Sequence, residues 1–227
     1  MSQTVPVVTI DGPSSSGKGT ISRLVATRVG WNLLDSGALY RLVALGGALR
    51  HLDPDDVEGH VGVARSMRVE FGSLGHEEQI QLDGQEVTAR VRAEETGAGA
   101  SRVAAWPAVR AALTDRQRSF AAPPGLVADG RDMGTVIFPG AQLKVFLTAS
   151  AEERAQRRHK QLIEKGSAAS LAALSREIAE RDLRDSTRQV APLKPAPDAQ
   201  LLDSTGLSID AVVERVLSLG RERGLWP

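Results

Sequence analysis

A glycine-rich turn between an apolar run and a helical pattern restricts this chain more than any other feature. It reads G-P-S-S-S-G-K-G-T from Gly12 to Thr20, directly after the apolar run Val5 to Ile10. The spacing matches G-x-x-x-x-G-K, in which glycines let the backbone approach an anion and the helix N-terminus favours negative charge. Lys18 adds a full charge that can reach the terminal phosphates of a nucleotide. The sequence therefore predicts a phosphate-binding loop rather than a plain turn before a helix.

The residue after Lys18 departs from the usual pattern of such loops. Gly19 stands where Ser or Thr normally holds Mg²⁺, and Thr20 follows one place later. A G-K-G-T ending resembles nucleoside monophosphate kinases rather than GTPases or motor ATPases. We therefore expect ATP as the nucleotide and a Mg²⁺ ion held by Thr20 largely through water. The residues expected to bind ATP are Gly12, Pro13, Ser14, Ser15, Ser16, Gly17, Lys18, Gly19 and Thr20.

Composition excludes several classes of protein. The formal net charge is zero, so a general nucleic-acid or membrane-surface role has no electrostatic support. The absence of cysteine excludes disulfides, thiolate metal sites and cysteine nucleophiles. Neither a secretory leader nor an apolar run of the roughly 20 residues that span a bilayer is visible. We expect a cytoplasmic monomer that binds small molecules and neither nucleic acid nor membrane.

Two further segments follow short apolar runs. D-S-G-A-L-Y-R, from Asp35 to Arg41, should start a second helix. There Arg41 could meet a phosphate, or Asp35 and Ser36 could simply cap the helix, and the residues leave both open. D-G-R-D-M-G, from Asp129 to Gly134, follows the buried-strand pattern Leu126 to Ala128. Open α/β sheets bind ligands just past the carboxyl ends of their strands. Asp129 is therefore well placed to bind Mg²⁺ through water, and Arg131 to bind a phosphate. The alternative is a solvent-exposed turn with a local Asp–Arg ion pair.

Residues 67–92 differ from the strand–helix alternation around them. Short segments of alternating apolarity flank the pair Asp83-Gly84, which is a strong hairpin signal. We read this segment as a small antiparallel insert beside the main sheet. Helix is expected again over 95–119, with a break or restart at Pro107.

Two groups of charged residues are spaced to share helix faces. The first is Arg154, Arg157 and Arg158, on a helix that begins with a capping box at Ser150 and Glu153. The second is Arg181, Arg184, Asp185 and Arg188. Such runs usually form a solvated, salt-bridged surface. In a protein that binds a triphosphate, two arginine faces on a helical hairpin also suit a closing lid, and this is the interpretation we adopt.

Five motifs together resemble one family, the bacterial cytidylate kinases, which are P-loop nucleoside monophosphate kinases acting on CMP and dCMP. They are I-D-G-P-S-S-S-G-K-G-T, L-L-D-S-G-A-L-Y-R, A-D-G-R-D-M-G-T-V, E-I-A-E-R-D and V-A-P-L. The likeness extends from about Val8 to the final helix. It implies an α/β P-loop kinase fold: a five-stranded parallel sheet flanked by helices, a small antiparallel insert that binds the nucleoside monophosphate, and a short helical lid.

The resemblance also implies domain limits and residue roles. The expected limits are 1–65 for the first part of the core, 66–95 for the insert, 96–153 for the second part of the core, 154–190 for the lid and 191–227 for the last strand and helix. The catalytic residues it implies are Lys18, Arg131, Arg157, Arg181 and Arg188. CMP or dCMP would be bound by Ser36, Tyr40, Arg41, Ser101, Arg110, Arg131, Asp132, Asp185 and Arg188. Metal-linked roles fall to Thr20 and Asp129.

The expected reaction is reversible transfer of the ATP γ-phosphoryl group to CMP or dCMP. Two alternatives share the loop. Another small-molecule kinase would have no need of the insert and of D-G-R-D-M-G, and a regulatory NTPase would want Ser or Thr in place of Gly19.

Overall fold

The computed structural model describes residues 5–74, 77–164, 166 and 170–227. It divides into two compact units. The first runs up to Asp35 and resumes as Arg118–Pro227, and the second is Ser36–Gln117.

The first unit is built on a five-stranded sheet in the order β2-β6-β1-β7-β8, in which every pairing is parallel. The strands are β1 (Val7–Asp11), β2 (Asn32–Asp35), β6 (Leu126–Gly130), β7 (Leu143–Thr148) and β8 (Gln200–Asp203). All residues of β1 and β6 are buried, as their continuous apolar runs predict for central strands of a parallel sheet. The predicted five-stranded parallel sheet is confirmed.

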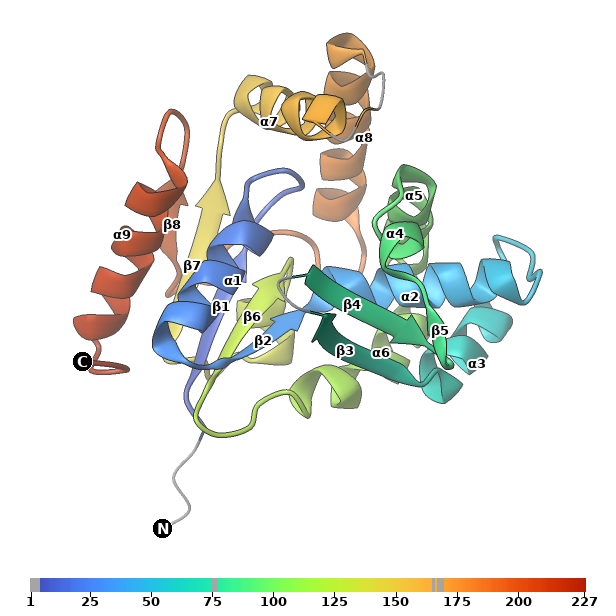
Figure 1. Ribbon diagram of the computed structural model, residues 1–227, viewed down its shortest axis with the longest axis horizontal. Helices are drawn as coiled ribbons and strands as arrows, with labels where there is room; N and C mark the ends of the chain where they lie inside the picture. Colours follow the sequence, from blue (N-terminus) through green and yellow to red (C-terminus); the bar gives the residue numbers. More distant parts are fainter. Residues whose placement is uncertain (1–4, 75–76, 165, 167–169) are drawn as a thin grey trace. The chain divides into compact units, whose positions relative to one another are not determined.

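Helices flank this sheet (Figure 1). They are α1 (Lys18–Val29), the short π-helix η1 (Met133–Ile137), α7 (Ala151–Glu164), α8 (Leu171–Thr187) and α9 (Ile209–Arg221). α1 and α9 share one apolar cluster with β1 and β7, which includes Ile10, Val25, Val145 and Val213. α7 and α8 lie beyond the carboxyl ends of the strands, on the side of the loop between β1 and α1 (Figure 1). The predicted two-helix segment after β7 is therefore present.

The second unit combines helices with a small antiparallel sheet in the order β3-β4-β5. Its elements are α2 (Ser36–Leu49), α3 (Val57–Ser66), β3 (Val69–Leu74), β4 (Glu77–Leu82), β5 (Gln85–Glu86), α4 (Thr88–Val91), α5 (Glu94–Val103) and most of α6 (Pro107–Arg118). Asp83 and Gly84 connect β4 to β5 with φ angles of 52° and 84°, so the predicted Asp-Gly hairpin turn is confirmed. The helix over 36–49 and the restart at Pro107 are confirmed as well. The limits predicted for a nucleotide-binding insert, 66–95, stay a prediction.

Within the described ranges, every helix is too short or too polar to cross a bilayer.

Candidate nucleotide-binding site

The loop between β1 and α1 has the strand–turn–helix setting that a phosphate loop needs. β1 ends at Asp11 and α1 begins at Lys18. A side chain at position 12 would collide with the carbonyl oxygen of Leu147 on β7, so glycine is required there. Ser15 and Gly17 have φ angles of 58° and 90°. Alternation of left-handed and ordinary residues turns successive N–H groups toward one side, which makes a concave site for an anion.

Lys18 lies across this loop. Its Nζ donates a hydrogen bond to the carbonyl oxygen of Pro13 at 3.1 Å. Its pKa is lowered from 10.5 to about 7, chiefly by burial and next by the Arg131 cation, while Asp129 opposes the shift. A bound anion would raise the pKa of Lys18 again, because it favours the charged form of the side chain.

Asp129, the residue before the last of β6, lies beside Lys18 and has an unused acceptor. Its side chain is buried, and Oδ1 has no hydrogen-bond partner among the described residues. Burial raises its pKa to about 7, against the opposing effect of Lys18. A Cβ at position 19 would lie 3.2 Å from Asp129 Oδ2, so Gly19 leaves room for this carboxylate. An oxygen ligand without a partner fits a hard divalent cation such as Mg²⁺.

Thr20, the second predicted metal residue, lies in the first turn of α1 and is exposed. Within the described residues, the structure contains no cluster of three or more His, Cys, Asp or Glu side chains that could hold a metal ion. Ser16, in the loop itself, has a buried Oγ without a partner in the described chain.

Asp11 fixes the segment that follows Asp129, a role the sequence reasoning missed. Its Oδ1 and Oδ2 accept hydrogen bonds from the backbone N–H groups of Met133 (2.9 Å) and Gly134 (2.8 Å), at the start of η1. Burial raises the pKa of Asp11 to about 6, although both hydrogen bonds lower it. The only signal in the sequence was an Asp at the end of an apolar strand.

The structure brings together two of the predicted substrate residues. Arg131 Nε donates to Asp185 Oδ2 of α8 at 2.8 Å, and both side chains are largely buried. Burial alone would raise the pKa of Asp185, but Arg131 outweighs it and holds that pKa below its ordinary value. The same pair holds the pKa of Arg131 above its usual value despite the cost of burial. Asp132, the next residue, is 2% exposed.

The arginines of α7 and α8 differ in their surroundings. Arg154 is buried and pairs with Asp182 of α8 at 2.6 Å, while Arg184 is exposed. Arg181 is half-buried, and the half-buried Arg188 donates from one terminal nitrogen to the carbonyl oxygen of Ala191 at 2.9 Å. Sequence reasoning missed Asp182, whose motif E-R-D gives no sign of its partner.

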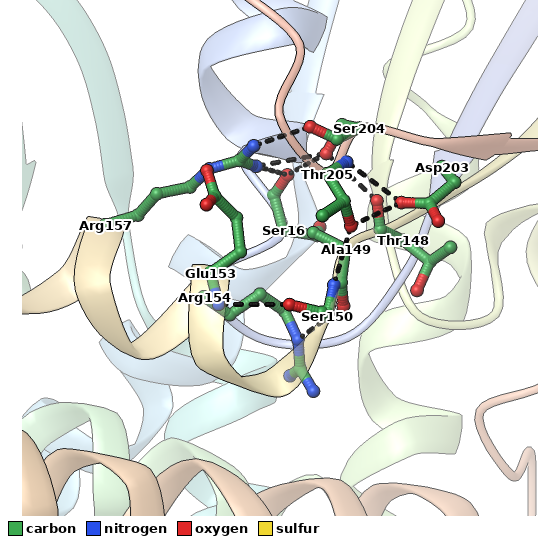
Figure 2. A network of polar contacts seen from close by, with 10 residues as sticks. All are labelled: Ser16, Thr148, Ala149, Ser150, Glu153, Arg154, Arg157, Asp203, Ser204 and Thr205. Atoms are coloured by element: carbon green, nitrogen blue, oxygen red, sulfur yellow. Dashed lines mark hydrogen bonds and ion pairs between the residues drawn. The ribbon is translucent and has the colours of Figure 1, made fainter.

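Arg157 is held among three residues near the phosphate loop (Figure 2). It donates to Glu153 Oε1 at 2.9 Å, to the carbonyl oxygen of Ser16 at 3.2 Å, and to the Oγ (3.0 Å) and carbonyl oxygen (2.7 Å) of Ser204. Ser204 follows β8 and was also missed.

The other predicted substrate residues belong to the second unit, where Ser36, Tyr40, Ser101 and Arg110 are all buried. Arg41 donates from one terminal nitrogen to the carbonyl oxygens of Val91 (2.9 Å) and Ala93 (3.1 Å). The Arg110 guanidinium carbon lies 5.7 Å from the centre of the Tyr40 ring, within range of a cation–π contact. Through these two hydrogen bonds Arg41 holds the backbone between α4 and α5.

Comparison with known proteins places this sequence in a family. The family model described as cytidylate kinase matches residues 8–222. A cytidylate kinase from Stutzerimonas stutzeri (strain A1501) is 56% identical over 227 residues, covering 99% of each chain. One from Pseudomonas aeruginosa (strain LESB58) is 58% identical over 219 residues, covering 96% of each. Among solved structures, a gluconokinase from Sinorhizobium meliloti 1021 aligns at a TM-score of 0.49 with 16% identity, over 97% of this chain and 95% of that one, and so weak a likeness decides nothing about activity. By the family match and by identity over almost its whole length, this chain belongs to the cytidylate kinase family.

Proposed function

We propose that this protein transfers the γ-phosphoryl group of ATP, as its Mg²⁺ complex, to CMP or dCMP in a reversible reaction of pyrimidine nucleotide metabolism. One observation carries the proposal beyond the family match: Lys18 and the unpartnered Oδ1 of Asp129 lie together beside the phosphate loop. That arrangement suits a nucleotide phosphate chain and its metal.

Phosphoryl transfer depends mainly on alignment and charge neutralisation. A phosphate monoester has a second pKa of about 6, so the acceptor is largely ionised near neutral pH and needs no strong general base. Lys18 binds the phosphate chain of ATP from the helix side of the loop. Arg131, Arg181 and Arg188 surround the moving charge. The family resemblance implies the same role for Arg157, which would first have to leave its hydrogen bonds to Ser16 and Ser204. Asp129 and Thr20 would hold Mg²⁺ through water, and the ion would supply further charge neutralisation.

The roles proposed for the acceptor follow the family resemblance. Ser36, Arg41 and Arg131 bind its phosphate, and Ser101, Arg110 and Asp132 bind the cytosine, with Tyr40 among the surrounding residues. Asp185 and Arg188 bind the ribose. The same proposal has the protein act in the cytoplasm as a monomer. Its substrates are small molecules, and neither nucleic acid nor a membrane is a partner.

One assay separates this function from the alternatives. The protein is incubated with Mg-ATP and a panel of acceptors that includes CMP, dCMP, UMP, AMP, shikimate and gluconate, and ADP release is measured. We expect release with CMP and dCMP well above the rate without acceptor. Release with a sugar or shikimate alone would indicate another small-molecule kinase, and release that no acceptor changes would indicate an NTPase.

A further inference from the structure

We propose that Arg154 and Arg157 are positioning residues that fix the phosphate loop from behind, through its carbonyl groups. Arg154 donates from one terminal nitrogen to the carbonyl oxygen of Ser14, and Arg157 likewise to that of Ser16, both at 3.2 Å. The two arginines are three residues apart on α7 and so share a face of the helix. They therefore hold alternate carbonyl groups of the loop.

Because of peptide geometry, holding these carbonyl groups also orients N–H groups on the opposite side of the loop. In a planar trans peptide the C=O and N–H groups point in opposite directions. The carbonyl of Ser14 shares a peptide unit with the N–H of Ser15, and that of Ser16 with the N–H of Gly17. Cations that hold the two carbonyls thus direct the N–H groups of Ser15 and Gly17 away from α7, and they strengthen both donors by polarising the peptide units.

Ser15 shows why the loop needs such support. Its φ of 58° is a left-handed conformation that a residue with a Cβ adopts at a cost. A strained residue of this kind persists only when its surroundings hold it. Arg154 does so by fixing the peptide unit that precedes Ser15. It is itself anchored by a hydrogen bond to the carbonyl oxygen of Ala149 (3.1 Å) and by an ion pair with Asp182 (2.6 Å).

Arg157 is committed to the same task. Its Nε and both terminal nitrogens are already engaged with Glu153, Ser16 and Ser204 (Figure 2). Ser204 is 2% exposed, and its Oγ also donates to the carbonyl oxygen of Thr148 on β7 at 2.9 Å. The guanidinium thus ties the loop to the ends of β7 and β8. To reach a transferring phosphoryl group it would have to leave these acceptors.

The test uses pyrophosphate and ADP binding by calorimetry, together with the amide NMR shifts of Ser15 and Gly17 in the full chain. It rests on the proposed function only in that the loop binds phosphate, and it involves no acceptor. A chain that binds ADP normally but fails to phosphorylate CMP would therefore refute the proposed function and leave this inference intact. Lys160→Met is the matched control, because Lys160 is an exposed cation on the same helix.

We expect Arg157→Met and Arg154→Met each to weaken pyrophosphate binding about tenfold, the loss typical of a hydrogen bond to a charged group. Arg157→Met should shift the Gly17 amide and Arg154→Met that of Ser15, with Lys160→Met moving neither. If Arg154→Met fails to fold, Arg154→Lys replaces it and should show a smaller loss. Wild-type affinity and amide shifts in the Arg157 variant would overturn the proposal.

A second substitution separates loop positioning from general destabilisation. Glycine adopts the left-handed conformation without strain. Ser15→Gly should therefore restore most of the affinity lost in Arg154→Met, and much less of that lost in Arg157→Met, since position 17 is already glycine. Failure of Ser15→Gly to restore binding in the Arg154 variant would show that the arginine does not act through the loop conformation.

Discussion

Asp11 should change the free energy of unfolding with pH in the direction opposite to that of most carboxylates. Its pKa is raised from 3.8 to about 6 by burial, in spite of the two N–H groups it accepts. A carboxylate whose folded-state pKa exceeds its unfolded value retains its proton longer in the folded protein. Its contribution to stability is complete below pH 3.8 and is lost as the pH rises through 6. About two pKa units at about 1.4 kcal/mol each make this loss about 3 kcal/mol.

Asp11→Asn isolates the effect. The asparagine is nearly isosteric, keeps one acceptor for Met133 or Gly134, and does not titrate. The free energy of unfolding is measured by urea at intervals between pH 4 and pH 7 for both proteins. Relative to the variant, the wild type should lose about 2 kcal/mol over this range, since part of the total loss has already occurred at pH 4 and every other titrating group is common to both.

Asp198→Asn is the control of opposite sign. The side-chain hydrogen bond from Lys144 lowers the pKa of Asp198, so this carboxylate stabilises the protein more as the pH rises. Because its stabilising effect is nearly complete above pH 3.8, the wild type should show at most a small gain, and no loss, relative to this variant between pH 4 and pH 7. A constant difference between wild type and Asp11→Asn from pH 4 to pH 7 would refute the argument that burial dominates at Asp11.

Three further predictions concern the site. Lys18→Met should lower kcat by several orders of magnitude with little change in Tm, and near-normal turnover would exclude the loop from the mechanism. Residues 154–164 and 170–188 should exchange amide hydrogens faster without nucleotides than with ADP and CMP bound, whereas equal protection would indicate a fixed wall rather than a lid. Asp132→Ala should reduce the ratio of kcat/KM for CMP over UMP by about 10-fold or more, since a carboxylate accepts from the cytosine amine and opposes the uracil carbonyl; equal losses for both substrates would assign Asp132 a structural role.

Local chemistry made much of this fold predictable. The hairpin followed from Asp83-Gly84, because only a few residue pairs adopt two successive positive φ angles. Half of the capping box predicted at the start of α7 forms, the hydrogen bond from Glu153 N–H to Ser150 Oγ at 3.2 Å. The reciprocal bond is absent, because Ser150 N–H donates to Thr205 Oγ1 and the Glu153 carboxylate accepts from Arg157. Contacts within a few residues of one another need no knowledge of the tertiary structure.

The contacts that sequence reasoning missed join residues far apart in the chain. Asp11 caps a segment 122 residues away, Arg154 contacts the loop 140 residues away, and Ser204 contacts Ser16 across 188 residues. Helical spacing correctly put Arg154 and Arg157 on one face, but spacing alone does not say what that face meets. α3 and η1 were not predicted, and the reading of residues 67–92 as strands was wrong for Thr88–Val91, which form α4 after the short β5. η1 depends on the distant carboxylate of Asp11 for its first N–H groups.

The departure at Gly19 becomes understandable only when both segments are seen together. In the usual pattern a hydroxyl at this position supplies an oxygen to the metal. Here a Cβ would stand 3.2 Å from Asp129 Oδ2, tighter than an ordinary van der Waals contact, so a side chain and the carboxylate compete for one space. Asp129 fills that space from β6 and keeps Oδ1 without a partner among the described residues. The missing side chain and the buried acid therefore belong to one arrangement, in which glycine at position 19 leaves room for a carboxylate from a neighbouring strand beside the phosphate loop.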